Sequence, residues 1–353
     1  MGRAKKAILI GAGAVGLLAL LGGGAIVWNI RYAYRDARAV ARAGFVERVV
    51  EIDGSTLNYA EGPPNGPPLV LVHGQLTDWR NWSRTLPALS RHFHVFAIDC
   101  YGHGKSAHVP RKYTANALAS DLRRFIEEVV GAPAVVAGHS SGGLVAAGLA
   151  AEAPEWVTGV VLEDPPFFSS LLPRAEKTFN YVDLATTAHE FLQSGEADFT
   201  LYYIRHAVMW TLFQGGEDWI RGQALRDRER HPDAPLRLYF MPPSINEMFR
   251  GMQTYDPRFG AAFFDGSFHD GFDHAEVLSR ISVPAALIHA NWSYDDDGIL
   301  LAAMDADDAE RARASIDDVT FHRVDTGHGF HFEAPDEMVR ITLELAARTS
   351  PAP

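Results

Sequence analysis

The sequence predicts an α/β protein with a mostly parallel central sheet and helices on both of its faces. Short apolar runs of the buried-strand type alternate with segments whose apolar residues recur at helical spacing. A helical pattern over residues 115–130, for example, separates the strand-like runs 94–98 and 134–137. An aromatic-rich, mainly helical stretch over residues 165–274 interrupts this alternation, and the strand pattern then returns. We therefore expect one α/β domain that carries an inserted helical cap.

The expected strands share a continuous apolar composition and end at turn residues. They are residues 45–50, 56–60, 68–72, 94–98, 134–137, 157–162, 283–289 and 319–324. The expected organisation is an N-terminal membrane anchor over 1–28, a basic linker over 29–44, a first part of the core over 45–164, the cap over 165–274, and a second part of the core over 275–353.

Composition excludes several classes of function. The chain has 353 residues, of which 47% are hydrophobic, so it can bury a full core. Its formal net charge of −12 argues against a nucleic-acid partner. Cys100 is the single cysteine in the sequence, which rules out an internal disulfide framework and a metal site built from cysteines.

The N-terminal segment contains a run of 22 uncharged residues, 7–28, long enough to span a bilayer as a helix. The run includes a Gly-x-Gly-x-x-Gly pattern at residues 11–16, but residues 17–28 lack the polar face that a dinucleotide-binding unit requires. The run is also too long for the apolar part of a typical cleaved signal peptide. We expect an uncleaved, single-pass anchor in the lipid bilayer. Basic residues flank both ends, so the side of the membrane is not indicated.

A nucleophile motif is the most informative local feature. Residues 138–142 read Gly-His-Ser-Ser-Gly, between an apolar strand and an apolar helix. A sharp strand-to-helix turn exposes the serine at its tip, and glycines on both sides relieve the crowding. Ser140 is therefore the candidate nucleophile, provided that a base lies beside it.

Three further stretches complete a resemblance to a known family. They are His73-Gly74-Gln75 after one strand, the Asp-x-x-Gly-x-Gly-x-Ser stretch 99–106 after the next, and Gly-His-Gly-Phe-His-Phe-Glu over residues 327–333. In this order, with the serine turn, they resemble the α/β-hydrolases that carry a cap domain. The resemblance covers residues 45–348 and implies a serine hydrolase that is esterase- or lipase-like.

The resemblance assigns roles to individual residues. His328, after the last strand, matches the family's catalytic histidine, and histidine titrates near neutral pH. His331 is its rival and is expected to be structural. The backbone N–H groups of Ser141 and Gln75 match the two donors that stabilise the oxyanion of the transition state.

The acid that orients the histidine is the weakest part of the pattern. The family usually places it after the strand that follows the cap, where this chain reads Ala-Asn-Trp-Ser-Tyr-Asp-Asp-Asp-Gly over 290–298. The usual spacing falls on Ser293, so Asp295, the nearest carboxylate, is the preferred candidate. Asp164, after the preceding strand, is the alternative, because some relatives use an acid there.

The aromatic cap predicts a small-molecule ester substrate with an apolar portion, and Phe167 and Phe168 are the candidate substrate contacts. No cofactor and no metal ion is implied. Two other reactions share the same triad, hydrolysis of a carbon–carbon bond and a cofactor-free peroxidase-like reaction. A binding protein that keeps an inactive hydrolase scaffold is the non-enzymatic alternative.

Overall fold

The computed structural model describes residues 29–349. The expected anchor, within residues 1–28, lies outside the described residues. Across residues 29–349, no helix combines the length and the apolar character needed to cross a bilayer.

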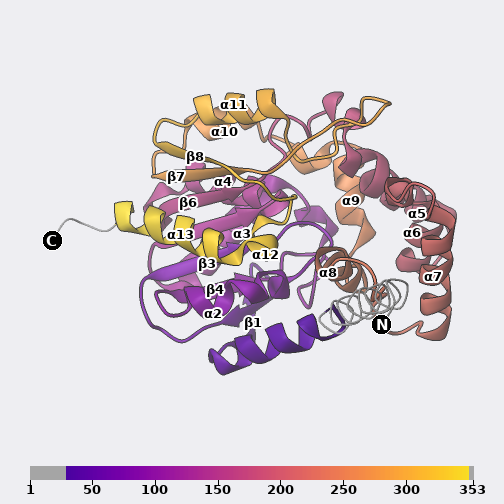
Figure 1. Ribbon diagram of the computed structural model, residues 1–353. Coiled ribbons are helices and arrows are strands. Elements are labelled where there is room, and N and C mark those ends of the chain that lie inside the picture. Colours follow the sequence, from indigo (N-terminus) through magenta and orange to yellow (C-terminus); the bar gives the residue numbers. More distant parts are fainter. Residues whose placement is uncertain (1–28, 350–353) are drawn as a thin grey trace, which may run out of the picture.

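An eight-stranded sheet forms the centre of the molecule (Figure 1). Its strands are β1 Val46–Ile52, β2 Ser55–Glu61, β3 Pro68–Val72, β4 His94–Ile98, β5 Ala134–His139, β6 Val157–Glu163, β7 Ala285–His289 and β8 Val319–Arg323. The spatial order is β1-β2-β4-β3-β5-β6-β7-β8. Strand β2 pairs antiparallel with both β1 and β4, and all other neighbouring strands pair parallel. This arrangement confirms the α/β class and the mostly parallel sheet.

The described helices complete the layers. They are an unlabelled helix over residues 29–42, α2 Leu86–Leu89, α3 Ala115–Phe125, α4 Ser141–Glu152, α5 Thr186–Ser194, α6 Phe199–His206, α7 Glu217–Arg230, α8 Pro243–Met252, α9 Pro257–Phe264, α10 His274–Ser279, α11 Ala306–Ala314, α12 Phe330–Glu333 and α13 Pro335–Thr349.

Two separate cores lie on the two faces of the sheet, because alternate side chains of a strand point to opposite sides. In β3, Val70 and Val72 pack into a core with α3 and α4, whereas Leu69 and Leu71 pack into a second core with α2 and α13. Covering both faces buries the parallel strands, as their continuous apolar composition requires.

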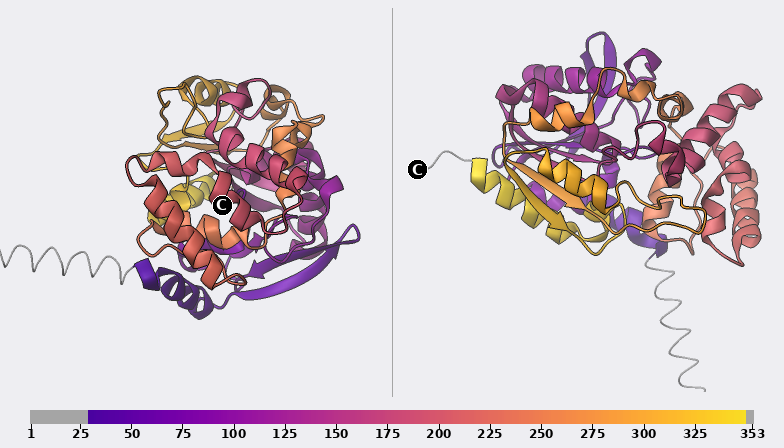
Figure 2. Two further views of the ribbon diagram at one scale, coloured as in Figure 1. Left: turned by 90° about the vertical axis from the view of Figure 1, so that its right-hand side faces the viewer. Right: turned by 90° about the horizontal axis from the view of Figure 1, so that it is seen from above.

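Helices α5 to α9 lie between β6 and β7 in the sequence and gather beyond one end of the sheet (Figures 1 and 2). Residues of this insertion share a cavity with Ser140, which directly follows β5. The insertion therefore covers the end of the sheet where the parallel strands finish, the usual location of ligand sites in such sheets.

The segment expected as a basic linker is instead helical over residues 29–42 and docked on the domain. Tyr32 and Val40 are buried in it, and Asp36 accepts a hydrogen bond from Arg84 Nε at 3.1 Å. Charged residues are frequent in this segment, and only these three positions are buried. The composition of the segment therefore predicted a solvated linker.

Candidate active site

Ser140 occupies a strained turn between β5 and α4. Its backbone angles are φ 55° and ψ −124°, outside the regions that a serine usually adopts. The Ser140 amide donates to the Glu163 carbonyl at 2.9 Å, and the Ser140 carbonyl accepts from the Gly143 amide at 2.8 Å. Hydrogen bonds on both sides thus hold the turn in this conformation, as expected where strain is part of a site.

The glycines around Ser140 permit close backbone contacts. A Cβ atom on Gly138 would lie 2.2 Å from the Gly142 carbonyl oxygen. One on Gly142 would lie 2.5 Å from the carbonyl oxygens of both Val72 and His73. The turn therefore fits against the end of β3 only because these positions carry no side chain.

Ser140 and His328 line the same cavity, which has a volume of about 400 Å³. The exposed surface of the lining is mostly apolar, although more than half of the lining residues carry a polar side chain. The lining consists of Gln75, Leu76, Thr77, Asn81, His139, Ser140, Pro166, Ser169, Ser170, Thr178, Phe179, Asn180, Asp183, Leu184, Tyr203, Ser244, Ile245, Met248, Leu301, Ala302, Ala303, His328, Gly329, Phe332 and Glu333. A concave site whose surface is mainly apolar and carries convergent polar groups is typical of small-molecule binding.

The carboxylate that reaches His328 belongs to Asp164. His328 Nδ1 lies 2.7 Å from Asp164 Oδ2, and Asp164 is buried. The other carboxylate oxygen accepts from the Ala290 amide at 3.2 Å, at the end of β7. Asp164 has φ 43°, a second strained residue directly after a strand. The carboxylate is thus fixed from two directions, and it fixes the imidazole.

This geometry contradicts the preference for Asp295 as the partner of His328. Asp295 is exposed, and its Oδ1 accepts from the amides of Asp297 at 3.0 Å and Ile299 at 2.8 Å, so it closes its own turn. The physical reason lies in the topology. Strands β6 and β7 are parallel neighbours, so an acid after either strand reaches the same edge of the sheet.

The environment of His328 raises its pKa above the ordinary 6.5. Burial on its own lowers the pKa, but the hydrogen bond and the charge of Asp164, together with the nearby Glu163, outweigh that effect. Asp164 thus favours the protonated ring, which is the form that a general base reaches after accepting a proton.

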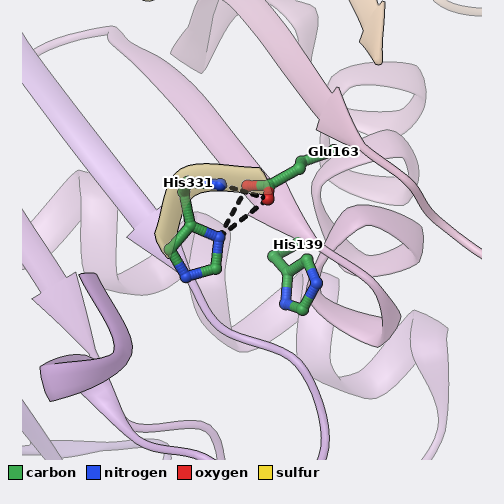
Figure 3. Close-up of side chains that lie close together, drawn as sticks. All are labelled: His139, Glu163 and His331. Atoms are coloured by element: carbon green, nitrogen blue, oxygen red, sulfur yellow. Dashed lines mark hydrogen bonds and ion pairs between the residues drawn. The ribbon is translucent and has the colours of Figure 1, made fainter. Parts of the chain in front are cut away.

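A buried group beside the site holds the segment that carries His328 (Figure 3). His331 Nδ1 lies 2.8 Å from Glu163 Oε1, and both side chains are fully buried. His331 Nε2 lies 2.7 Å from Asn81 Oδ1. Both ring nitrogens of His331 therefore have an oxygen partner, which makes it a structural residue of the loop and α12.

His139 completes this group. His139, Glu163 and His331 each place one potential metal-ligating atom within 4.8 Å of the others. However, His331 is already satisfied by Glu163 and Asn81, so the three residues fit a hydrogen-bonded group better than a metal centre. Burial lowers the pKa of His139 well below its ordinary value, and the neutral ring donates through Nε2 to the His328 carbonyl at 2.9 Å.

The two expected oxyanion donors belong to two different elements, α4 and the loop that follows β3. Ser141 is the first residue of α4, where the helix dipole favours negative charge. Gln75 lines the cavity, and its side chain is held by the cap, because its Oε1 accepts from the Tyr255 hydroxyl at 3.0 Å.

Phe167 and Phe168 lie in the core, not in the described lining of the cavity, so their prediction as substrate contacts is wrong for this structure. The guanidinium of Arg311 lies 3.8 Å from the centre of the Phe168 ring, and the Phe168 amide donates to His274 Nδ1 at 2.8 Å. The left-handed backbone at Phe168, with φ 64°, turns the chain inward after the strand. Proximity in sequence to the strand end was therefore a misleading signal.

Several residues that the structure brings to the site have only weak signals in the sequence. Glu163 is a charged residue directly after the expected apolar strand 157–162, and it ends strand β6 in a fully buried position, so its charge could have marked it. Asn180, Asp183 and Tyr203 come from the cap, and their place in the cavity depends on helix packing that no local pattern encodes.

Comparisons with known proteins identify the family of the chain. The sequence profile described as "Alpha/beta hydrolase family" matches residues 69–341. The chain is 34% identical over 113 residues to a serine hydrolase-like protein of Homo sapiens, which covers 31% of this chain and 55% of that protein. It is 31% identical over 126 residues to 2-hydroxy-6-oxo-6-(2'-aminophenyl)hexa-2,4-dienoic acid hydrolase of Metapseudomonas resinovorans, which covers 35% of this chain and 43% of that enzyme.

The matches to curated relatives are partial. A dihydrolipoyllysine-residue acetyltransferase component of the acetoin cleaving system of Pseudomonas putida is 37% identical over 113 residues, which is 32% of this chain and 30% of that protein. The chain thus spans between 30% and 55% of the length of these relatives.

Solved structures resemble the whole domain. A bacterial membrane phospholipase A superposes with a TM-score of 0.63 at 22% identity, over 98% of this chain and all of that one. The enol-lactonase of Burkholderia xenovorans LB400 gives a TM-score of 0.58 at 21% identity, over 85% of this chain and all of that one. At these identities the likeness concerns the fold.

The glycine contacts yield a stability prediction. Gly142→Ala should lower the free energy of unfolding by about 1–3 kcal/mol, because its Cβ would overlap the backbone of β3. Gly222→Ala on α7 is the control. Its Cβ would meet nothing closer than Arg226 Nη1 at 3.5 Å, so it should leave stability unchanged or raise it by up to about 1 kcal/mol. Thermal unfolding compares the two, and equal melting temperatures would contradict the close packing described for the turn.

Proposed function

Because this chain belongs to the alpha/beta hydrolase family, we propose that it is a serine hydrolase that cleaves carboxylic esters with an apolar portion. Ser140 is the nucleophile, His328 the base and Asp164 the orienting acid. The observation that carries this proposal is the pairing of His328 with a buried carboxylate at 2.7 Å, on the wall of a cavity that Ser140 also lines.

The proposed reaction has two halves. In the first, His328 takes the proton of the Ser140 hydroxyl while its oxygen attacks the ester carbonyl, and the N–H groups of Gln75 and Ser141 stabilise the oxyanion. The C–O bond then breaks, and His328 returns the proton to the departing alcohol. In the second half, His328 deprotonates a water molecule that attacks the acyl-enzyme. The bond between the acyl carbon and the Ser140 oxygen then breaks, His328 returns the proton to that oxygen, and the carboxylic acid departs.

The charge of the cavity supports an ester over a dienoic acid as the substrate. Among the described lining residues, none is lysine or arginine, whereas Asp183 and Glu333 are acidic. Burial raises the pKa of Asp183 to about 6, and its Oδ1 accepts from the Met209 amide at 2.6 Å. The carboxylate of a dienoic acid would be buried here without a cationic partner, at a cost of several kcal/mol. The carbon–carbon hydrolase alternative is therefore less favoured.

Covalent labelling tests the nucleophile. A fluorophosphonate should label the wild-type protein stoichiometrically and should leave Ser140→Ala unlabelled. Folded wild-type protein that resists the probe would contradict the enzyme assignment and favour the binding-protein alternative. With p-nitrophenyl esters, kcat/KM for octanoate should exceed that for the anionic hemisuccinate by about a hundredfold or more. Preference for the hemisuccinate would contradict the charge argument.

The pH profile tests the acid. The pKa of His328 is raised, so its neutral form is available only at higher pH, and kcat/KM should increase with pH through an apparent pKa above 6.5. In Asp164→Asn the hydrogen bond to the carboxylate and its charge, which both raise the pKa of His328, are lost, so the apparent pKa should fall. The plateau should also drop by about 10³- to 10⁴-fold.

Asp295→Asn is the matched control for this experiment. It makes the same chemical change at an exposed carboxylate, and both the plateau and the apparent pKa should stay within about twofold and a few tenths of a unit of wild type. If Asp295→Asn lost activity and Asp164→Asn did not, the assignment of the acid would be overturned.

A second part of the proposal concerns location. We propose that residues 7–28 hold the protein at a membrane, since this run is uncharged and flanked by basic residues. Two features of the described chain support this. Ile30 and Tyr34 are exposed on the helix over residues 29–42, and Asn29 Nδ2 donates to the carbonyl of Tyr239, itself exposed beside Phe240. Exposed aromatic side chains next to an apolar run are typical of the membrane interface.

Two charges within the run should release the protein. Leu17→Asp combined with Leu20→Asp places two carboxylates where each costs about 3 kcal/mol in a spanning helix. We expect the variant in the supernatant after ultracentrifugation of cell membranes and the wild type in the pellet. Leu192→Asp, at an exposed leucine of α5, should stay in the pellet. Recovery of the double variant in carbonate-washed membranes would contradict the anchor.

A further inference from the structure

The cap helix α8 lies directly against the loop that follows β3, residues 73–78. A Cβ atom on Gly251 of α8 would lie only 1.9 Å from the Leu76 carbonyl oxygen, so helix and loop touch backbone to backbone. Leu76 itself has φ 59°, an unfavourable conformation for a leucine. A loop with such a residue keeps its shape only when its surroundings hold it.

A bidentate ion pair joins the same two elements. Arg250 of α8 donates through both terminal nitrogens to the carboxylate of Asp78, with Nη2 3.0 Å from Oδ1. Asp78 is buried, and its Oδ1 also accepts from the Arg80 amide at 2.8 Å, where it caps the short 3-10 helix Trp79–Arg84. Burial alone raises the pKa of Asp78, but Arg250 outweighs it and lowers the pKa to about 2. The carboxylate is therefore ionised, and the pair persists, at any physiological pH.

The other end of the loop is fixed by the core. His73 Nε2 accepts from the Cys100 amide at 3.0 Å, which leaves the proton on Nδ1 to be donated to the Gly74 carbonyl at 2.7 Å. Burial lowers the pKa of His73 to about 4, which keeps this neutral form. Gln75 thus lies between an end held by the sheet and an end held by α8.

The contact continues from α8 to the helix over residues 29–42. Glu247, one turn before Arg250, accepts from Arg250 Nε at 2.8 Å through Oε2. Its Oε1 accepts from the Tyr32 hydroxyl at 2.8 Å. A phenylalanine at position 32 would keep the ring and lose only this hydrogen bond. The chain of contacts therefore runs from Tyr32 through Glu247 and Arg250 to Asp78 and the loop, and all of these side chains except the partly exposed Arg250 are buried.

We propose that Arg250 is a positioning residue: through Asp78 it holds the Gln75 amide where it stabilises the oxyanion, and Tyr32 supports it through Glu247. This inference rests on the proposed serine-hydrolase function. It assigns a catalytic consequence to the cap and to the helix that follows the uncharged N-terminal run, because both hold one wall of the oxyanion site.

The test is Arg250→Lys, which keeps the charge and loses the planar fork. After active-site titration with a fluorophosphonate, kcat per titrated site should fall by about tenfold or more, with KM within about twofold, because a displaced oxyanion donor weakens the transition state and not substrate binding. The inhibition constant of a trifluoromethyl ketone, whose hemiketal oxyanion occupies the same site, should rise in parallel.

Arg258→Lys is the matched control. Arg258, on α9, makes a similar fork to Asp256, with Nε 2.8 Å from Oδ1 and Nη2 2.8 Å from Oδ2, yet this pair does not join the loop 73–78. Its kcat should stay near that of wild type. Tyr32→Phe removes one hydroxyl and should lower kcat by about twofold to tenfold, and it carries the test if Arg250→Lys does not fold.

Equal kcat values for Arg250→Lys and Arg258→Lys would overturn the inference. So would a fall in kcat that leaves the inhibition constant of the ketone unchanged, because the lost contact would then act elsewhere than on the oxyanion. Failure of the underlying function has a different signature, since wild-type protein would then neither label nor hydrolyse esters.

Discussion

The contact between His328 Nδ1 and Asp164 Oδ2 is the interaction on which the proposed site depends. The pair is assembled from distant parts of the chain by the strand order. Strand β6 brings Asp164 to the edge of the sheet, the neighbouring β7 supplies the Ala290 amide that fixes it, and the segment after β8 brings the imidazole. The sheet therefore positions the two residues, and the negative charge of Asp164 favours the protonated form of His328.

Close packing around the serine turn fixes the position of Ser140 relative to the sheet. The turn carries no side chain at Gly138 and Gly142, so backbone lies against backbone where β3, β5 and α4 meet. The buried pair of Glu163 and His331 supports the segment of the base in the same region. Strain at Ser140 and Asp164 is tolerated because these neighbours leave the chain no alternative.

The sequence was sufficient for the parts of the fold that repeat a local pattern. Apolar runs predicted the strands of the parallel sheet. The serine turn could be predicted because a side chain at either flanking glycine would overlap neighbouring backbone atoms. The sequence did not indicate the partner of His328, because acids that follow β6 and β7 lie at the same end of these parallel strands. Only the folded chain distinguishes Asp164 from Asp295. Cap residues such as Arg250 and Asp183 gave no signal, because their roles arise from contacts between helices far apart in sequence.

Proton NMR of the protein at low temperature tests the central claim most directly. The Nδ1–H of His328, donated to a buried carboxylate, should give a strongly downfield-shifted resonance in wild-type protein and in Asp295→Asn. The same resonance should vanish in Asp164→Asn and shift when a fluorophosphonate modifies Ser140. The Nδ1–H of His331, held by the buried Glu163, should give a separate resonance that is the same in all these variants. A downfield resonance that responds to modification of Ser140 and still persists in Asp164→Asn would show that another group holds the imidazole of His328 and would contradict the account.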